Sequence, residues 1–187
     1  MKQRWVMEER VFQEVKKSIA ESLRIDPDSV QPDSSLVENL GAESLDFLDM
    51  NYRLEQVFGI RMARHFVLEH VEEIFGEGSA IDENGKLTQR GVELLKIRLG
   101  DRDPRLKPGV DLDQITRLIT VQSLARGVMD ILNSLPGTCT ACGASAWLSE
   151  DGARIRCGSC GKSAVFATGD NLIKEWLKKV QEEKKIF

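Results

Sequence analysis

The chain has 187 residues, of which 30 are acidic and 26 basic, so its formal net charge at pH 7 is −4. This mild charge argues against general affinity for nucleic acid, and no apolar leader or run long enough to cross a membrane is evident, so we expect a cytoplasmic protein. The four cysteines lie in two close pairs, which without export signals favours a metal site over disulfides.

The first expected helix covers residues 7–25. Its apolar residues recur with charged residues opposite them, at Val11, Phe12, Val15, Ile19 and Leu23. Pro27 and Pro32 bracket the loop that follows, in which Val30 and Leu36 are expected to anchor the loop to the core.

A second helix is expected to begin just after Gly41 and to end at Gly59. Two apolar sets recur at helical spacing, Leu45, Leu48 and Tyr52 on one side and Phe47, Met50, Leu54 and Phe58 on another. Ser44 falls in the first turn, where unpaired backbone N–H groups and the helix dipole favour an anion such as a phosphate ester. Serine is also a common N-cap with no chemical role.

The sequence around Ser44, Leu-Gly-Ala-Glu-Ser-Leu-Asp over residues 40–46, resembles the modification site of acyl carrier proteins, usually Leu-Gly-Ala/Gly-Asp-Ser-Leu. Asp49, Leu54-Glu55 and Phe58-Gly59-Ile60 also resemble the second helix of that family. The resemblance covers roughly residues 7–60 and resumes at 112–133. It implies a four-helix bundle in which Ser44 carries a covalent 4′-phosphopantetheine arm, with acyl groups held on the arm's thiol as thioesters.

The same resemblance implies partners. In the family, a phosphopantetheinyl transferase attaches the arm from coenzyme A with magnesium, and acyl-transferring or synthase enzymes recognise the acidic second helix. Partner contacts are thereby implied for Glu43, Leu45, Asp46, Asp49, Tyr52 and Glu55. Residues 1–60 contain twelve acidic and seven basic residues, which would steer this part of the chain toward basic surfaces.

Two residues depart from the family pattern. Glu43 replaces the usual aspartate, which could weaken recognition by a general transferase. Arg53 replaces a small residue and lies four positions after Asp49, close enough to pair with it and blunt the acidic patch. This departure suggests a dedicated set of partners.

Residues 61–110 interrupt the resemblance and are interpreted as a helical insertion. Helices are expected at about 66–75 and 88–99. We expect this pair to pack over the carrier bundle, because its apolar faces cannot be left in water, with a mobile lid as the alternative. His65 and His70 are five residues apart, which does not place them on one helical face as a ligand pair, so we interpret them as surface or packing residues.

The resemblance resumes with a short third helix near residues 112–115 and a last helix from Thr120, the expected N-cap, to about Leu132. The residues expected to face inward on the last helix are Val121, Leu124, Val128, Ile131 and Leu132.

Two Cys-x-x-Cys-Gly knuckles follow, with fourteen residues between the last cysteine of the first, Cys142, and the first cysteine of the second, Cys157. This spacing places four thiolates on one tetrahedral ion, and the expected ligands are Cys139, Cys142, Cys157 and Cys160. Strands are expected at 146–148, 154–156 and 163–167, with a hairpin at Asp151-Gly152, so the segment resembles a zinc ribbon. Four thiolates fill the coordination of zinc and leave no catalytic position. We expect the ribbon to dock a partner enzyme or brace the carrier domain, rather than to contact nucleic acid.

A final amphipathic helix is expected from Asp170, its cap. The expected fold is therefore mainly α. It has an acyl-carrier-like domain over 1–135 with the insertion at 61–110, a three-stranded zinc ribbon over 136–168 and a terminal helix over 169–187. The resemblance implies a monomeric carrier, not an enzyme, that serves a specialised fatty-acid, lipid or polyketide pathway. The alternative is an unmodified, carrier-shaped interaction module that organises a complex through its ribbon.

Overall fold

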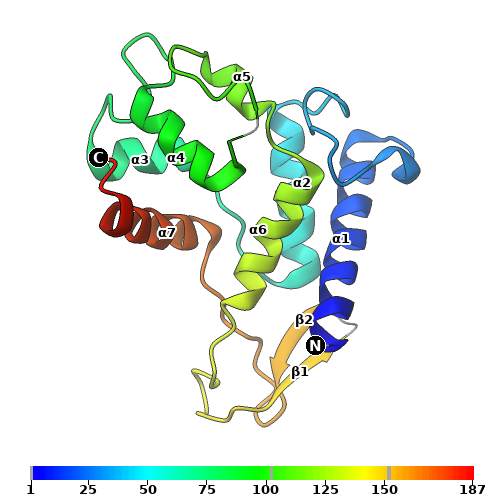
Figure 1. Cartoon of the computed structure of the whole chain (residues 1–187). Helices are drawn as coiled ribbons and strands as arrows, with labels where there is room; N and C mark the ends of the chain where they lie inside the picture. Colours follow the sequence, from blue (N-terminus) through cyan, green and yellow to red (C-terminus); the bar gives the residue numbers. More distant parts are fainter. Residues whose placement is uncertain (1, 102, 151–152) are drawn as a thin grey trace. The chain divides into compact units, whose positions relative to one another are not determined.

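A computed structural model describes residues 2–101, 103–150 and 153–187 of the chain (Figure 1). The chain divides into two compact units, each built from separate stretches of sequence. Unit 1 comprises Met1–Met62 and Ile119–Gly169, and unit 2 comprises Ala63–Leu118 and Asp170–Phe187. The described residues form seven α-helices and one two-stranded sheet, which confirms the predicted mainly α fold with a small ribbon. In this part of the chain, no helix combines the length and apolar character needed to cross a bilayer.

Three helices form the core of unit 1: α1 (Lys2–Leu23), α2 (Ser44–Phe58) and α6 (Val121–Asn133). Helix α1 contacts both others. The predicted apolar stripes are buried here, as the amphipathic pattern requires; they include Val11, Val15, Ile19, Met50, Leu54, Phe58, Val121, Val128 and Ile131. A short 3-10 helix, η1 (Pro27–Ser29), lies in the loop after α1.

The loop before α2 is held to the start of α6 by backbone hydrogen bonds. The Leu36 N–H donates to the Ile119 carbonyl at 2.9 Å, and the Val121 N–H donates to the Ser34 carbonyl at 3.1 Å. Gly41 then adopts a left-handed φ of 73°, which suits a residue without a side chain. Together these contacts fix where α2 begins.

The ribbon belongs to unit 1. Strand β1 (Trp147–Glu150) pairs antiparallel with β2 (Arg154–Cys157), with Trp147 opposite Cys157. The expected third strand is not formed as a strand among the described residues. Ser163 makes an isolated bridge to Arg156 and the Ala164 N–H donates to the Ile155 carbonyl at 2.9 Å, but the pairing extends no further, and the Ala167 N–H donates to the Ser134 hydroxyl at 3.0 Å. The expected Asp151-Gly152 hairpin turn lies outside the described residues.

Two further contacts join the ribbon to the helical part of unit 1. The Arg154 guanidinium donates to the Gln56 carbonyl near the end of α2, and the Trp147 indole N–H donates to the Pro136 carbonyl at 2.9 Å. The ribbon is thus connected both to α2 and to the segment that follows α6.

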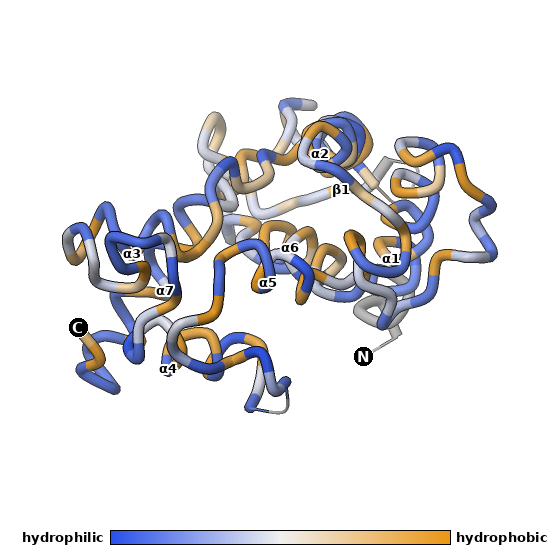
Figure 2. Tube along the Cα trace, turned by 90° about the horizontal axis from the view of Figure 1, so that it is seen from above, coloured by the Kyte–Doolittle hydropathy of each residue, from blue (hydrophilic) through white to orange (hydrophobic). Residues whose placement is uncertain are grey.

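Unit 2 contains α3 (Val67–Phe75), α4 (Gln89–Leu99), α5 (Leu112–Thr116) and nearly all of α7 (Gly169–Lys184). These helices carry both hydrophilic and hydrophobic residues (Figure 2). The apolar faces share one core, whose buried members include Leu68, Val71, Leu94, Leu95, Leu106, Ile115, Leu177 and Val180.

The α3–α4 pair buries its apolar residues with α7, whose own stripe at Leu177 and Val180 needs the same cover. This use of α7 was not expected from the sequence, and the packing of the pair over the carrier bundle stays a prediction. The expected third helix exists as α5, yet its Ile115 also joins the unit 2 core. The division into a carrier domain, ribbon and terminal helix as separate folding domains stays a prediction.

Candidate functional site

Ser44 is the first residue of α2 and is exposed to solvent. The N-cap is the preceding residue, Glu43, whose backbone is extended and whose N–H donates to Asp46 Oδ2 at 2.8 Å. Among the described residues, no hydrogen-bond partner is found for the Ser44 hydroxyl. The hydroxyl therefore does not cap the helix, and it lies beside the helix N-terminus, where a phosphate group is favoured.

An exposed apolar stripe runs along α2 from the residue after Ser44. Leu45 is 78% exposed, Leu48 55% and Tyr52 59%, while Met50 and Leu54 on the same helix are fully buried. We call Leu45, Leu48 and Tyr52 the α2 stripe. Large apolar side chains kept in solvent beside an exposed hydroxyl are suited to contact a second protein.

The acidic residues predicted for the same surface are not equally available. Asp49 accepts the Arg53 Nε–H at 2.8 Å and the Ser22 hydroxyl at 2.7 Å, and the Arg53 guanidinium continues to Glu21 on α1 at 2.7 Å. The predicted Arg53–Asp49 pair is thus confirmed and extended. The hydrogen bond from Arg53, followed by that from Ser22, holds the pKa of Asp49 below its ordinary value.

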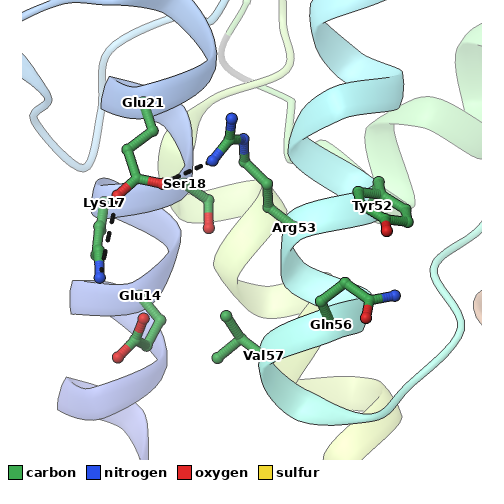
Figure 3. Close-up of a pocket in the computed structure, with 8 residues that line it drawn as sticks. All are labelled: Glu14, Lys17, Ser18, Glu21, Tyr52, Arg53, Gln56 and Val57. Atoms are coloured by element: carbon green, nitrogen blue, oxygen red, sulfur yellow. Dashed lines mark hydrogen bonds and ion pairs between the residues drawn. The ribbon is translucent and has the colours of Figure 1, made fainter.

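Arg53 lies in a groove between α1 and α2 (Figure 3). The residues that line the groove are Glu14, Lys17, Ser18, Glu21, Tyr52, Arg53, Gln56 and Val57. Glu21 contacts both Arg53, at 2.7 Å, and Lys17, at 4.0 Å, so Arg53 is part of a network between the two helices and not of an isolated pair.

Glu55 corrects the predicted partner surface. Its side chain is only 7% exposed, and Oε1 accepts the Met62 N–H at 2.9 Å. The helical turn places Glu55 next to Leu54 on the buried side of α2, so this carboxylate anchors the chain after the helix. It does not lie on the exposed surface with the α2 stripe.

The four cysteines form a compact cluster. Cys139 Sγ lies 3.8 Å from Cys160 Sγ, Cys142 Sγ lies 3.6 Å from Cys157 Sγ, and all four sulfurs lie within 4.8 Å of one another. A tetrahedral zinc ion with Zn–S bonds of about 2.3 Å places its sulfurs about 3.8 Å apart. The cluster therefore fits one structural zinc ion held by four thiolates.

The two knuckles repeat the same backbone pattern. Gly143 donates to the Cys139 carbonyl and Gly161 to the Cys157 carbonyl, both at 2.8 Å, with φ of 74° and 71° at the two glycines. These left-handed conformations explain the glycine after each second cysteine. Backbone N–H groups of Cys160 and Ser159 lower the pKa of the Cys157 thiol to about 7, which favours the thiolate at this ligand. At Cys142 the Ala144 N–H lowers the pKa of the thiol, but the neighbouring Cys160 and Cys157 side chains outweigh it and raise that pKa to about 11.

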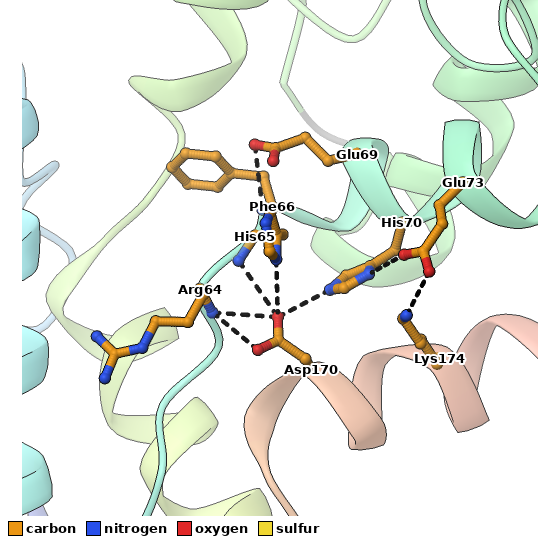
Figure 4. A network of polar contacts seen from close by, with 8 residues as sticks. All are labelled: Arg64, His65, Phe66, Glu69, His70, Glu73, Asp170 and Lys174. Carbon is orange, nitrogen blue, oxygen red and sulfur yellow. Dashed lines mark hydrogen bonds and ion pairs between the residues drawn. The ribbon is translucent and has the colours of Figure 1, made fainter.

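Figure 4 shows a polar cluster around His70 and Asp170 that was not predicted from the sequence. His70 is buried in α3, and its Nε2 lies 2.9 Å from Asp170 Oδ1 on α7. Asp170 was expected to cap α7, but it lies in the first turn and accepts the N–H groups of Arg64 and His65. A separation of 100 residues between His70 and Asp170 hides this contact from local pattern analysis.

Comparison with known proteins bears on the first of these sites. A family model described as a phosphopantetheine attachment site matches residues 13–72. An acyl carrier protein of Campylobacter hominis is 44% identical over 52 residues, which is 28% of this chain and 66% of that relative. An acyl carrier protein of Sulfurovum sp. is 42% identical over 52 residues, 28% of this chain and 69% of the relative.

A third relative, acyl carrier protein AcpXL of Brucella melitensis, is 41% identical over 51 residues, or 27% of this chain and 55% of the relative. The chain thus spans between about half and about two thirds of the length of these curated relatives, and no solved structure matches it. The matched segment contains the α2 helix with Ser44 at its start. The chain belongs to the acyl carrier protein family, with a helical insertion and a four-cysteine ribbon as additions.

Proposed function

We propose that this protein is a carrier that holds acyl intermediates as thioesters on a 4′-phosphopantetheine arm attached to Ser44. The observation that carries the proposal is the position of the Ser44 hydroxyl, exposed and unpartnered among the described residues at the start of α2, inside the segment that matches the attachment-site family. The helix N-terminus there would stabilise the phosphodiester.

The chemistry expected of this chain is limited to what these residues provide. A separate transferase would use coenzyme A, with the Ser44 oxygen attacking the phosphorus next to the pantetheine group, losing its proton and releasing the nucleotide part. The carrier would supply the hydroxyl and a docking surface, and its clients would catalyse the acyl transfers. We propose a specialised fatty-acid, lipid or polyketide pathway as the setting.

We propose that partners dock chiefly on the α2 stripe, with Glu43 and Asp46 beside it. Asp49 is engaged by Arg53 and Ser22, and Glu55 is buried, so fewer free carboxylates face a partner than the sequence suggests. Apolar contact buried at the centre of such an interface supplies affinity, while the remaining charges affect the association rate. A dedicated transferase or synthase would suit this surface.

For the zinc ribbon we propose a bracing role. Its contacts with α2 and with the segment after α6, through Arg154, Trp147 and Ala167, support this proposal. One observation favours the alternative, an unmodified module that organises a complex through its ribbon: Leu148 and Val165 on the ribbon are both exposed.

The test is intact mass after co-expression with a competent transferase. We expect one phosphopantetheine per chain, and none on Ser44→Ala. Ser29→Ala, which changes an exposed serine in η1, is the matched control and should load normally. Because Glu43 is the N-cap, Ser44→Ala should change the free energy of unfolding by less than about 0.5 kcal/mol. An unmodified wild-type chain would favour the interaction module, whereas loading at another serine would overturn the assignment of the arm to Ser44.

A further inference from the structure

Unit 2 contains a cluster of metal-ligating side chains that is separate from the four cysteines. His70 Nε2 lies 2.9 Å from Asp170 Oδ1, and His65 Nδ1 lies 3.7 Å from the same oxygen. The two imidazole rings pack edge to face with their centroids 5.6 Å apart. A ligand atom from each of the three residues lies within 4.8 Å of the others, so one ion could reach all three (Figure 4).

The orientation of His70 is set by a second carboxylate. Its side chain is 3% exposed, and Nδ1 lies 3.4 Å from Glu73 Oε2, while Lys174 Nζ holds the other Glu73 oxygen at 2.7 Å. An imidazole that donates its Nδ1–H to Glu73 turns the Nε2 lone pair toward Asp170. Metal-binding histidines are characteristically held in this way, with the distal N–H donated to a carboxylate.

Backbone N–H groups also hold the Asp170 carboxylate in place. The Arg64 N–H lies 3.1 Å from both carboxylate oxygens, and the His65 N–H lies 3.2 Å from Oδ1. These backbone donors occupy one side of the carboxylate and hold its charge in place. His65 lies before α3 and not on it. His65 and His70 are therefore not subject to the rule that two residues five positions apart face different sides of a helix.

Both nitrogens of the buried His70 ring face carboxylate oxygens, which only accept hydrogen bonds when ionised. A protonated imidazolium donates to both of them, whereas a neutral imidazole has one N–H to donate. With that proton on Nδ1, the Nε2 lone pair faces Asp170 Oδ1, and a metal cation bound to both atoms takes the place of the second proton.

We propose that His65, His70 and Asp170 bind a divalent transition-metal ion, with zinc as the best fit. Two imidazoles and one carboxylate suit zinc and its neighbours in the first transition row, whereas magnesium and calcium prefer oxygen ligands. Three protein ligands leave a fourth position, and water can reach it because the His65 side chain is 60% exposed. The ion links α7 to the segment that precedes α3 within unit 2.

The test is the zinc stoichiometry of the full chain, measured by equilibrium dialysis and elemental analysis. We expect two zinc ions per chain, of which His65→Ala loses one. Asp170→Asn, which keeps the size of the side chain and an acceptor oxygen, should also lose one. Arg64→Ala keeps the backbone N–H and serves as the matched control, with two ions retained. Cys157→Ser should lose the ribbon zinc and keep the other.

Imidazole nitrogen NMR locates the ion, because the chain has only two histidines. Zinc added beyond one equivalent should move the signals of both rings and raise the melting temperature of the wild type but not of His65→Ala. Saturation of both the wild type and His65→Ala at one zinc per chain would overturn the proposal. So would a second equivalent that leaves both imidazole signals unchanged, because that ion would be bound elsewhere.

Discussion

At the scale of single residues, Arg53 determines how much negative charge α2 presents. It binds Asp49 on its own helix and Glu21 on α1, so two carboxylates share one guanidinium. A partner with a basic surface therefore meets a weaker acidic field than the number of acidic residues suggests. The family resemblance identified Arg53 as a departure from the usual small residue, and the structure shows which carboxylates it binds.

Arg53→Ala should speed loading of Ser44 by a general, basic-surfaced transferase. The substitution frees Asp49 and Glu21 and strengthens the attraction that brings the two proteins together, an effect that salt screens. The measurement is the loading rate as a function of ionic strength, with the largest gain at low salt. Lys17→Ala, which removes a weaker contact with Glu21 and leaves Asp49 paired, is the control. A rate that is unchanged or slower at every ionic strength would contradict the argument.

The same substitution should raise the pKa of Asp49 toward its ordinary value. A carboxyl whose pKa is lower in the folded chain stabilises the fold at pH values above its unfolded pKa, and this contribution is lost as the pH falls through the folded pKa. The stability difference between wild type and Arg53→Ala should therefore be present at neutral pH and disappear in acid. It should stay below about 1 kcal/mol, because solvent screens this half-exposed pair. Carboxyl-carbon NMR follows the pKa directly.

Glu55 is predicted to be a residue of stability and not of partner recognition. Glu55→Ala removes the acceptor of the buried Met62 N–H and should lower the free energy of unfolding by about 1–3 kcal/mol. Glu55→Gln retains an acceptor oxygen and should cost less. Denaturant unfolding measures both variants, and an equal effect of the two would show that charge, rather than the hydrogen bond, is what matters.

At the scale of elements, two helical glycines have opposite roles. A Cβ on Gly91, in the first turn of α4, would lie 2.5 Å from the Ala80 carbonyl oxygen and 2.8 Å from Leu87 Cδ1, because the loop before the helix packs closely over it. A Cβ on Gly127, within α6, would have no heavy atom within 4 Å. Close packing explains the first glycine but not the second.

Gly91→Ala should therefore destabilise unit 2 by about 1–3 kcal/mol through overpacking. Gly127→Ala should stabilise α6 by about 0.5–1 kcal/mol, since alanine loses less backbone entropy in a helix. Amide hydrogen exchange in α4 and α6 measures each effect in the helix concerned. Faster exchange of α6 in the Gly127→Ala variant, or unchanged exchange of α4 in the Gly91→Ala variant, would contradict these predictions.

At the scale of the whole molecule, removal of the ribbon zinc tests how far the ribbon and the helices depend on each other. A strong chelator, or Cys157→Ser, should unfold residues 139–167, because metal binding supplies on the order of 10 kcal/mol of folding free energy to so small a ribbon. The helical core of unit 1 has its own buried residues and should persist. Circular dichroism should retain its helical signal, and Ser44 should still be loaded. Loss of both the helical signal and Ser44 loading would show that the helices of unit 1 need the folded ribbon.

A second whole-molecule prediction concerns the independence of unit 1. A chain in which residues 1–62 are joined by a flexible linker to 119–169 lacks α3, α4, α5 and α7, whose apolar residues form a core of their own. It should remain helical, bind one zinc and accept the arm. An unfolded product would mean that unit 2 is required for the carrier fold, and that the proposed domain division is wrong.

The features that were predicted correctly depend on residues close together in the sequence. The two sides of α2, with Leu45 exposed and Met50 buried, follow from helical spacing alone, and the cysteine knuckles carry their own spacing and glycines. Glu55 was misplaced because its partner, the Met62 N–H, depends on how the chain turns after α2.

The features that were missed depend on distant segments. Leu177 on α7 shares a core with Val71 on α3, and an amphipathic pattern does not say which apolar face will cover it. The cluster of His65, His70 and Asp170 arises from the same packing, because it exists only where the start of α7 meets the chain around α3.

The packing of α3 against α7 also bears on how the protein is made. As a ribosome releases the chain from its N-terminus, His70 emerges 100 residues before Asp170, and the apolar residues of α3 and α4 must wait for α7 to be synthesised. Nascent chains paused in the ribbon would expose Leu68, Val71 and Leu95 to solvent, and exposed apolar residues of this kind bind chaperones and promote aggregation. Unit 2 therefore cannot complete its core before α7 has been synthesised, and a premature stop before α7 would leave the apolar residues of α3 and α4 uncovered in a chain that still contains Ser44.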